Sequence, residues 1–396
     1  MISTSSFQGR YLTWFQLGAC LVAVPCLCFL PLTLFVKLIG VISITAIAVV
    51  CILTPTVMWL AHRLNAMDYP GGRRIHMAPT PRWGGIAVCV GVLTALVVAS
   101  ASYMPNVRGL ILGSVLVMLT GVWDDWKPVR ASVKLLIQFG ACAILILDGV
   151  HVMFMPHNAW GMVGYWLITA LWIIGITNAV NFLDGMDGLV SGLSMGTALT
   201  YFILAILLGN NMLAYCSAAL GAAAFAFLGF NVRPAKIFLG DSGSTFLGFF
   251  LATLSVQGSW AHNNPLVSFF IPILVLSVPI YDMVFITVER VLSGKVCSFK
   301  TWIEYTGKDH LHHRLEALGL SRGEVVTVIC FLNLAVGFSA IVLIHAGTFN
   351  GIVLLVQACC IYAIFALLEV LGGRKARAAL TGGNGPAKTD GPGLAV

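Results

Sequence analysis

The chain has 396 residues, of which 59% are hydrophobic and only 9% are charged, with a mean hydropathy of +0.95 and a net charge of +7. Roughly a quarter of the residues in a soluble globular domain are charged, so this composition excludes that class and indicates a polytopic membrane protein. Most of the 11 cysteines, such as Cys89 and Cys142, fall inside apolar runs. The cysteines therefore predict core packing and no disulfide framework.

Roughly twelve apolar segments come close to the length of about 20 residues that a membrane-spanning helix needs. They lie at residues 11–31, 38–61, 84–103, 108–123, 133–150, 163–180, 189–208, 212–230, 243–259, 265–288, 324–345 and 349–371. The expected fold is an all-α polytopic membrane protein with about 11–12 transmembrane helices and a cytoplasmic active site. We expect an additional hydrophobic helix at 1–36, retained because it has no clear signal-peptide cleavage site, a membrane domain at 37–372 and a disordered cytoplasmic tail at 373–396.

The basic residues of the loops indicate the orientation. Lysines and arginines gather on one predicted side, from Arg63 to Lys388, whereas the other side has Lys37 and Arg108. The positive-inside rule makes the first side cytoplasmic. Nearly every carboxylate falls there too, with Asp148 as the exception, and this mixture suits an anionic substrate with a divalent cation as well as anionic lipid headgroups.

The sequence NAVNFLDGMDG, residues 178–188, places Asp184 and Asp187 where an apolar run ends. Ionisable groups at such a position are costly and indicate a functional site, although an acidic turn that caps two helices is the alternative. Two other acidic segments lie on the same face. DDWKPVRASVK, 124–134, has adjacent carboxylates, one of which gains by binding a cation or a proton. NVRPAKIFLGDSGS, 231–244, has Asp241 just before a helix whose free amides can face an anion.

Two basic segments complete this face. RRIHMAPTPRWGG, 73–85, is broken by prolines, and its arginines also fit a positive-inside anchor. KDHLHHRL, 308–315, carries three histidines. A zinc site at these histidines is the weaker interpretation because no Cys or Glu stands at a suitable spacing.

Oxygen ligands at several helix ends favour Mg²⁺. GDSGS is similar to the nucleophile segment of trypsin-like proteases, with Ser242 as nucleophile, but the sequence has no β-barrel pattern. Acids for a cation and bases for phosphates on one face indicate phosphoryl transfer at a membrane surface. An ion-coupled transporter is the competing class, but it would place its acids near the midplane of the membrane.

Five motifs occur in order between about residues 54 and 371: TPRWGG, GVWDDWKPVRASVKLLIQ, NAVNFLDGMDGL, NVRPAKIFLGDSGS and KDHLHHRLEALGLSR. In these motifs the chain resembles the polyprenyl-phosphate N-acetylhexosamine-1-phosphate transferases of glycosyltransferase family 4. The HLHHRL motif resembles that of one branch of the family, whose enzymes start teichoic acids, enterobacterial common antigen and O antigens with N-acetylglucosamine (GlcNAc). The alternative is the phospho-N-acetylmuramoyl-pentapeptide transferase branch, whose histidine loop differs. The chain departs from the family in the apolar segment before Phe35 and in the run containing TWIEYTG.

The resemblance implies roles for individual residues. Mg²⁺, for which Mn²⁺ can substitute, would be held by Asp241 and Asn181. Uracil would stack on Phe238, with Asp187 bonding the base edge. We therefore expect catalytic residues at Asp124, Asp125, Asp184 and Lys134, and further substrate-binding residues at Asn231, His310, His312, His313 and Arg314.

The reaction implied by the resemblance is transfer of a sugar-1-phosphate, with GlcNAc-1-phosphate as the default, from a UDP-N-acetylhexosamine to undecaprenyl phosphate. UMP would leave, in the first membrane step of cell-envelope polysaccharide synthesis. The expected location is the bacterial cytoplasmic (inner) membrane, with membrane lipids and no nucleic acid as partners, and the resemblance allows a homodimer. Residues 297–307 predict either a short interfacial segment, because aromatic residues alternate there with charged ones, or an ordinary solvated loop.

Overall fold

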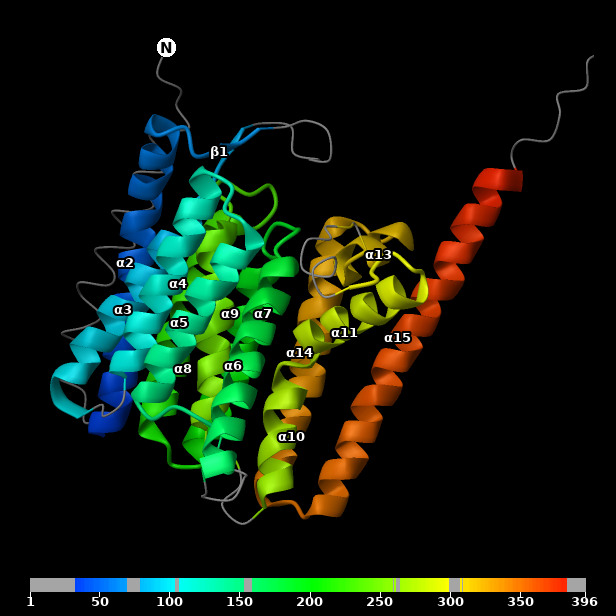
Figure 1. The fold of residues 1–396 in the computed structure, drawn as a ribbon. Helices are drawn as coiled ribbons and strands as arrows, with labels where there is room; N and C mark the ends of the chain where they lie inside the picture. Colours follow the sequence, from blue (N-terminus) through cyan, green and yellow to red (C-terminus); the bar gives the residue numbers. More distant parts are fainter. Residues whose placement is uncertain are drawn as a thin grey trace, which may run out of the picture.

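The apolar segments form long helices that lie side by side in a bundle (Figure 1). The computed structural model describes residues 33–69, 79–103, 107–152, 159–258, 260, 264–298, 307 and 309–382. The membrane-domain helices are α2 (Leu34–Arg63), α3 (Gly84–Tyr103), α4 (Arg108–Trp126), α5 (Ala131–Leu147), α6 (Ala159–Phe182), α7 (Leu189–Leu207), α8 (Asn211–Asn231), α9 (Gly240–Gln257), α10 (Pro265–Val275), α11 (Ser277–Leu292), α14 (Arg322–Val342) and α15 (Thr348–Gly382). A short helix α13 (Leu311–Ala317), a 3₁₀ turn η1 (Leu343–His345) and an antiparallel pair of strands, β1 (Met67–Asp68) and β2 (Thr80–Pro81), complete the described elements.

These helices confirm the expected all-α polytopic membrane fold. By length and composition, seven helices in the described ranges can cross a membrane, or up to 8 if the bent pair α10 and α11 is one span. The 11–12 helices expected include the segment at 11–31, which lies outside the described residues. The seven also leave out α3, α5, which is only 17 residues long, and α9, which opens with the polar sequence GDSGST.

The prediction of a single helix at 265–288 is wrong. The chain breaks at Leu276 into α10 and α11, whose axes differ by 81°. Pro279, in the first turn of α11, cannot donate a hydrogen bond to Val275, and its ring would clash with that carbonyl in a continuous helix. The break turns α11 away from α10 toward α13 and α15 (Figure 1).

Helix α9 is the centre of the packing near the site. Phe246, Phe249 and Phe250 of α9 are fully buried. Glycines of α3 and α4 let those helices approach its first turn, because a Cβ on Gly85 would lie 2.0 Å from the Gly243 nitrogen and a Cβ on Gly121 2.4 Å from the Ser242 Cα. Small residues at crossings allow this close backbone approach in membrane bundles.

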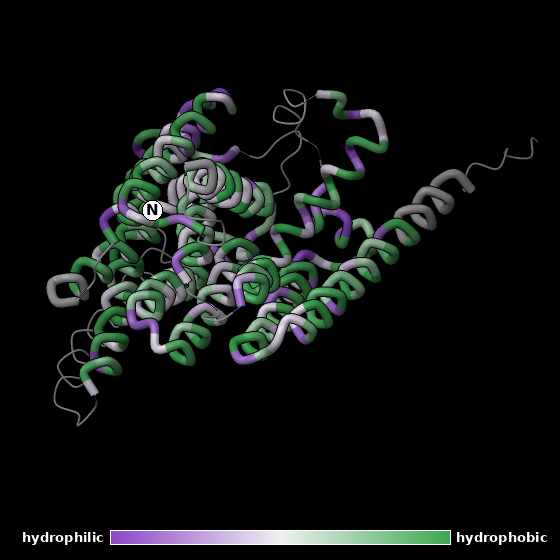
Figure 2. Tube along the Cα trace, turned by 60° about the horizontal axis from the view of Figure 1, so that its bottom comes forward, coloured by the Kyte–Doolittle hydropathy of each residue, from purple (hydrophilic) through white to green (hydrophobic). Residues whose placement is uncertain are grey.

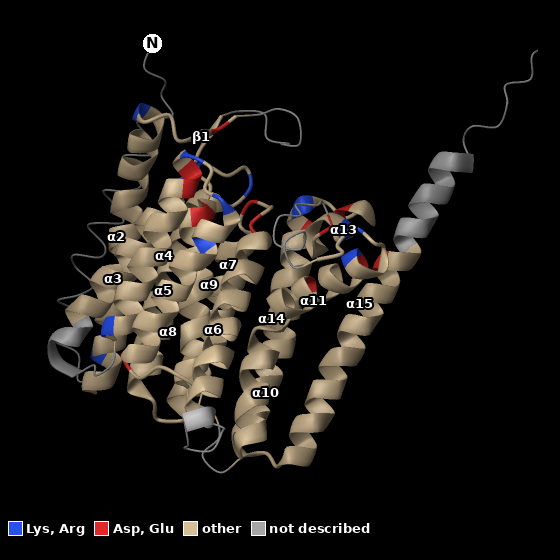
Figure 3. Cartoon of the chain, in the orientation of Figure 1, with Lys and Arg blue, Asp and Glu red and all other residues tan. Residues whose placement is uncertain are grey.

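Charge is concentrated at one end of the bundle. Figure 3 shows most charged residues of the described part at the end where α4 finishes and α9 begins. Hydrophobic residues predominate along the helices between the two ends (Figure 2). Asp148 lies at the opposite end, as the sequence predicted. Its Oδ2 accepts from the Gly109 nitrogen at 2.8 Å.

The C-terminal tail requires a correction. Helix α15 continues to Gly382, so the first part of the segment expected to be disordered from residue 373 is helical. Residues 383–396 lie outside the described residues, as do the additional helix expected at 11–31 and most of the interfacial segment expected at 297–307.

Candidate active site

The adjacent acids Asp124 and Asp125, in the last turn of α4, contact different partners. Asp125 Oδ1 accepts from the Asp241 nitrogen at 2.9 Å, and its Oδ2 accepts from the Ser242 nitrogen at 3.0 Å. These are free N–H groups of the first turn of α9, which a carboxylate satisfies as a helix cap does. Gly240 has a φ of +71°, and a Cβ there would lie 2.5 Å from Asp125 Oδ2, so both its conformation and its contact require glycine.

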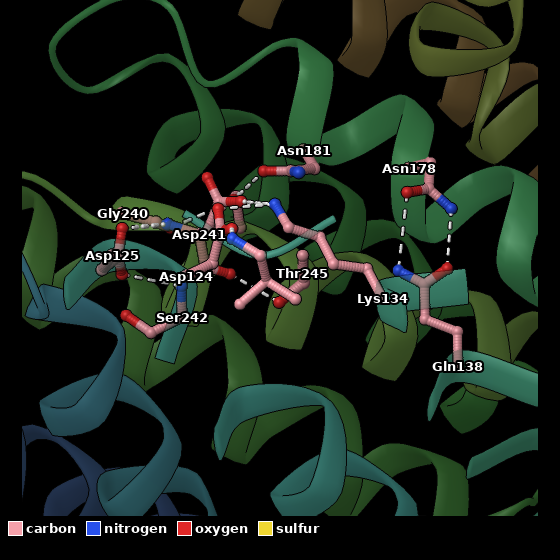
Figure 4. A network of polar contacts seen from close by, with 12 residues as sticks. Asp124, Asp125, Lys134, Gln138, Asn178, Asn181, Gly240, Asp241, Ser242 and Thr245 are labelled. Carbon is pink, nitrogen blue, oxygen red and sulfur yellow. Dashed lines mark hydrogen bonds and ion pairs between the residues drawn. The ribbon is translucent and has the colours of Figure 1, made fainter. Parts of the chain in front are cut away.

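Asp124 belongs to a second arrangement, with Lys134 of α5 and Asp241 of α9 (Figure 4). Asp124 Oδ1 accepts from the Val129 nitrogen at 2.7 Å, and Asp124 Oδ2 lies 2.5 Å from Lys134 Nζ. The same ammonium lies 2.6 Å from Asp241 Oδ2. Three helices thus bring together two carboxylates and one lysine, all partly accessible to solvent.

Asn181, near the end of α6, lies beside the first turn of α9 (Figure 4). Its Oδ1 accepts from Ser244 Oγ at 2.6 Å, and Ser244 is one turn beyond Asp241. On the α5 side of α6, Asn178 Nδ2 donates to Gln138 Oε1 at 2.8 Å, which fixes α6 against the helix that carries Lys134. The residues expected to hold a metal are therefore on neighbouring elements.

The chemistry of these donors fits Mg²⁺. Asp241 and Asp124 offer carboxylate oxygens and Asn181 an amide oxygen, the kind of ligand that Mg²⁺ prefers. A side-chain cation, the Lys134 ammonium, already lies between the two carboxylates. Among the residues that the structure describes, no group of three or more His, Cys, Asp or Glu side chains could hold a metal ion. Substrate oxygens and water would therefore have to complete a Mg²⁺ shell, as is common for this ion. The three histidines of 310–313 do not form a zinc-type cluster in the described part of the chain.

Asp184 lies in the turn between α6 and α7 and is half-buried. Burial, followed by the negative charges of Asp241 and Asp125, raises the pKa of the Asp184 carboxyl well above its ordinary value. The nearby Arg82 guanidinium acts in the opposite direction on this pKa. Asp184 is therefore electrostatically part of the same site as Asp125 and Asp241.

The other acid of this turn, Asp187, is tied to the loop after α8. Asp187 Oδ2 accepts from the Ala235 nitrogen at 3.2 Å. Buried Asn231 strengthens the link, because its Oδ1 accepts from the Gly188 nitrogen at 3.0 Å and its Nδ2 donates to the Ile237 carbonyl at 3.0 Å. The side-chain amide of Asn231 is thus occupied in holding the two loops together.

Phe238 lies on that loop, and its backbone is also bound to the segment around β2. The Phe238 nitrogen donates to the Pro81 carbonyl at 2.9 Å, and the Gly84 nitrogen donates to the Phe238 carbonyl at 3.0 Å. Three motifs that are far apart in sequence, those containing Pro81, Asp187 and Phe238, therefore adjoin.

The histidine segment packs against the turn that follows α6. The His310 ring centroid lies 5.6 Å from that of Phe182, and His312 packs so closely on Gly185 that a Cβ there would lie 2.2 Å from His312 Nε2. His312 is 1% exposed, and neither ring nitrogen has a hydrogen-bond partner in the described ranges. Burial, then the neighbouring His313 and His310, lower the pKa of His312 well below its ordinary value, so its ring is neutral.

His313 and Arg314 are placed differently. His313 Nδ1 lies 3.7 Å from Glu316 Oε2 on the next turn of α13. The Arg314 guanidinium lies between α11 and α15, with Nη2 3.3 Å from Asp282 Oδ1 and Nε 3.2 Å from Glu369 Oε2. These two carboxylates already engage the guanidinium. Contact of Arg314 with pyrophosphate stays a prediction.

Sequence reasoning did not single out three of these residues. Arg82, which pairs with Asp68 at 2.6 Å, stands inside the TPRWGG motif. Asp282 and Glu369 fall inside predicted membrane helices, and an ionisable residue inside an apolar segment is a signal that would have found both.

A carboxylate–lysine cluster at one end of an apolar helical bundle defines an integral membrane protein equipped for anionic substrates. Comparison with known proteins identifies the family. Residues 107–259 match the sequence model "Glycosyl transferase family 4". The chain is 36% identical over 310 residues to the probable undecaprenyl-phosphate N-acetylglucosaminyl 1-phosphate transferase of Bacillus subtilis (strain 168), covering 77% of this chain and 85% of that protein. The chain therefore belongs to glycosyl transferase family 4, and the resemblance seen in its motifs is confirmed.

Two other relatives come from different branches. The decaprenyl-phosphate N-acetylglucosaminephosphotransferase of Mycobacterium tuberculosis (strain ATCC 25618 / H37Rv) is 30% identical over 366 residues, which cover 84% of this chain and 89% of that protein. The phospho-N-acetylmuramoyl-pentapeptide-transferase of Staphylococcus carnosus (strain TM300) is 28% identical over 333 residues, 76% of this chain and 97% of that protein. Similarity is thus higher to these two GlcNAc-phosphate transferases than to the muramoyl-pentapeptide enzyme.

Proposed function

We propose that the protein transfers GlcNAc-1-phosphate from UDP-GlcNAc to undecaprenyl phosphate and releases UMP. The observation that carries this proposal is the contact of Lys134 with both Asp124 and Asp241, beside Asn181, at the charged end of the bundle. A phosphoryl transfer needs mainly positioning and neutralisation of charge, and this cluster offers both. The names of the GlcNAc-phosphate transferase relatives support the same donor and acceptor classes.

In the proposed reaction, an oxygen of the lipid phosphate attacks the β-phosphorus of the UDP-sugar. The bond from that phosphorus to the oxygen bridging the two phosphates breaks, a new phosphoanhydride forms with the lipid phosphate, and UMP leaves with the electron pair. Asp124 would accept a proton from a protonated lipid phosphate; Asp125 suits this role less, because both of its oxygens accept from the first turn of α9. Lys134 would neutralise phosphate oxygens next to Asp124.

Asp241 and Asn181 would hold Mg²⁺ or Mn²⁺, which when bound would neutralise charge on the diphosphate. The uracil base would occupy the region where the Asp187 and Phe238 loops adjoin. His312 is neutral, and its two buried ring nitrogens have no hydrogen-bond partners among the described residues, so one of them would donate to a sugar-phosphate oxygen when substrate binding brings that oxygen into contact. Asp184 and His310 would line the same region.

We further propose that the charged end faces the cytoplasm of a bacterial cell, in the inner membrane. The positive-inside distribution of the loop lysines and arginines supports this orientation. Membrane lipids surround the apolar helices, and the exposed Phe331 and Leu371 are examples of side chains that suit that environment. The product would enter cell-envelope polysaccharide synthesis.

The test is an assay of membranes that contain the protein, with undecaprenyl phosphate and a panel of UDP-sugars. The panel includes UDP-GlcNAc, other UDP-N-acetylhexosamines and UDP-N-acetylmuramoyl-pentapeptide. We expect one UMP for each lipid-linked GlcNAc pyrophosphate, identified by its mass. Use of the muramoyl-pentapeptide donor alone would assign the chain to that branch, and solute uptake into vesicles without UMP formation would support a transporter.

A further inference from the structure

Asp282 is a buried carboxylate at the centre of the contacts that hold the histidine segment. It lies in α11, just past the break at Leu276, and is 1% exposed. Its Oδ2 lies 2.8 Å from His310 Nδ1, and its Oδ1 accepts from the Leu311 nitrogen at 2.6 Å. The carboxylate thus contacts the first turn of α13 through both a side chain and the backbone.

A second carboxylate holds α13 from the other side. Glu369 of α15 lies 3.2 Å from Arg314 Nε, while Arg314 Nη2 lies 3.3 Å from Asp282 Oδ1. The Tyr281 hydroxyl donates to Glu369 at 3.4 Å, and the Tyr281 ring stacks on Tyr362 with centroids 4.6 Å apart. Helix α13 is therefore fixed between α11 and α15 by one arginine shared between two acids.

The contact with Asp282 determines the state of the His310 ring. An ionised carboxylate only accepts hydrogen bonds, so the proton in this contact must be on His310 Nδ1. In the neutral ring Nε2 is then the acceptor nitrogen. A carboxylate that bonds one ring nitrogen fixes both the tautomer and the orientation of a histidine. Here it keeps the ring beside Phe182, next to the candidate metal ligand Asn181.

We propose that Asp282 is a positioning residue that sets the tautomer and orientation of His310 and, with Glu369 acting through Arg314, holds the histidine segment against the turn after α6. This proposal rests on the proposed function, in which His310 lines the substrate site. The contacts of α13 with that turn are the packing of His310 on Phe182 and of His312 on Gly185. A shift of α13 would move both histidines together.

The decisive variant is Asp282→Asn, which is nearly isosteric and keeps one oxygen for the Leu311 nitrogen. Its amide NH₂ would face His310 Nδ1 and favour the opposite tautomer, with the proton on Nε2. We expect kcat for GlcNAc-phosphate transfer to fall about 10–100-fold, by analogy with the loss seen when a partner that orients a metal-bound histidine is removed. The KM for UDP-GlcNAc should change less than kcat if His310 acts mainly in the transition state.

A double-mutant cycle separates positioning from general stability. If Asp282 acts through His310, Asp282→Asn should cause a clearly smaller loss of kcat in a His310→Ala background than in wild type, and the remaining loss would come from the displacement of His312. The matched control is Asp309→Asn, which replaces one of the two carboxylate oxygens that accept from Arg290 at 2.8 and 2.7 Å. The losses from Asp309→Asn and His310→Ala should multiply, because that pair does not hold the His310 ring.

A readout independent of activity is the nitrogen-15 histidine spectrum of the full-length protein in detergent. Wild type should show His310 protonated at Nδ1, identified by comparison with His310→Ala, and Asp282→Asn should change that signal. Multiplicative losses in the Asp282 and His310 cycle, or a wild-type His310 protonated only at Nε2, would overturn the proposal. The wild-type spectrum reports the His310 tautomer, and so tests the proposal, even if Asp282→Asn does not fold. Absence of UMP formation by the wild type, with an Nδ1-protonated His310, would instead refute the proposed function.

Discussion

Asp125 accepts the backbone N–H of Asp241 at 2.9 Å, so the acid that ends α4 caps the helix that presents the candidate metal ligand. Its neighbour Asp124 points instead to Lys134. Adjacent acids in one motif therefore have separable tasks, one holding the first turn of α9 and the other facing the space where phosphates would bind.

The first prediction follows from this division. Asp125→Ala should lower the free energy of unfolding by about 0.5–2 kcal/mol, the usual effect of losing a helix cap. Asp124→Asn should leave stability close to that of wild type while lowering kcat by roughly 10²–10⁴-fold, the contribution of a proton acceptor. Thermal unfolding in detergent and UMP release measure the two effects. Equal effects of both substitutions on stability and on kcat would contradict the division.

The sequence could predict the helices and the shared face of the motifs, because apolar length and loop charge are local properties. It could not separate Asp124 from Asp125, since their partners come from α5 and α9, more than a hundred residues away in the case of Asp241. Hydropathy also predicts one span at 265–288, because the apolar run continues on both sides of the break at Leu276.

Residue types expected to bind substrate turned out to have structural contacts as well. Asn231 joins two loops through its amide, and Arg314 is held by Asp282 and Glu369. A motif shows that a residue type matters at a position, but the partner that explains it becomes visible only in three dimensions. The acids that hold Arg314 stood inside segments that hydropathy assigned to the membrane.

The second prediction concerns metal removal. A chelator in excess should stop UMP release, and Mg²⁺ or Mn²⁺ should restore it. The reason is that a cation held by the oxygens of Asp241 and Asn181 would complete its ligand shell with oxygens of the substrate diphosphate. Asn181→Ala should raise the Mg²⁺ concentration required for half-maximal activity. Gly175→Ala, also in α6 and with nothing within 4 Å of the added Cβ, is the control and should not raise it. Full activity in excess chelator would contradict a metal requirement.

The third prediction uses the close contact of Gly185 with His312. Gly185→Ala would put a Cβ 2.2 Å from His312 Nε2, so the His312 ring must move away from its position in wild type. We expect a loss of UDP-GlcNAc use of at least about tenfold in kcat/KM, similar to that of His312→Ala, if the ring contributes one hydrogen bond to a charged substrate. Gly175→Ala in α6, where a Cβ would meet nothing within 4 Å, is the matched control and should behave as wild type. Normal kinetics of Gly185→Ala would make the position of His312 unimportant.

The last prediction concerns the effect of pH on stability through Asp184. Its pKa is raised well above the ordinary value by burial and by the charges of Asp241 and Asp125. In the pH range between the unfolded and folded pKa values, the folded state therefore binds more protons than the unfolded state, so stability falls as pH rises. The effect starts near pH 4, where an unfolded aspartate ionises, and reaches its full size above the folded pKa.

Asp184→Asn removes this titration while keeping the size of the side chain. The variant should unfold at a higher temperature than wild type at pH 7–8, and the difference should shrink as pH is lowered to about 4 and below, because the wild-type carboxyl then becomes protonated in the unfolded state as well as in the folded state. Asp148→Asn, at the opposite end of the bundle, is the comparison for the loss of an acid outside this site. Thermal unfolding in detergent across this pH range measures the difference. A stability gain for Asp184→Asn that does not vary with pH would show that the carboxyl is ionised alike in both states.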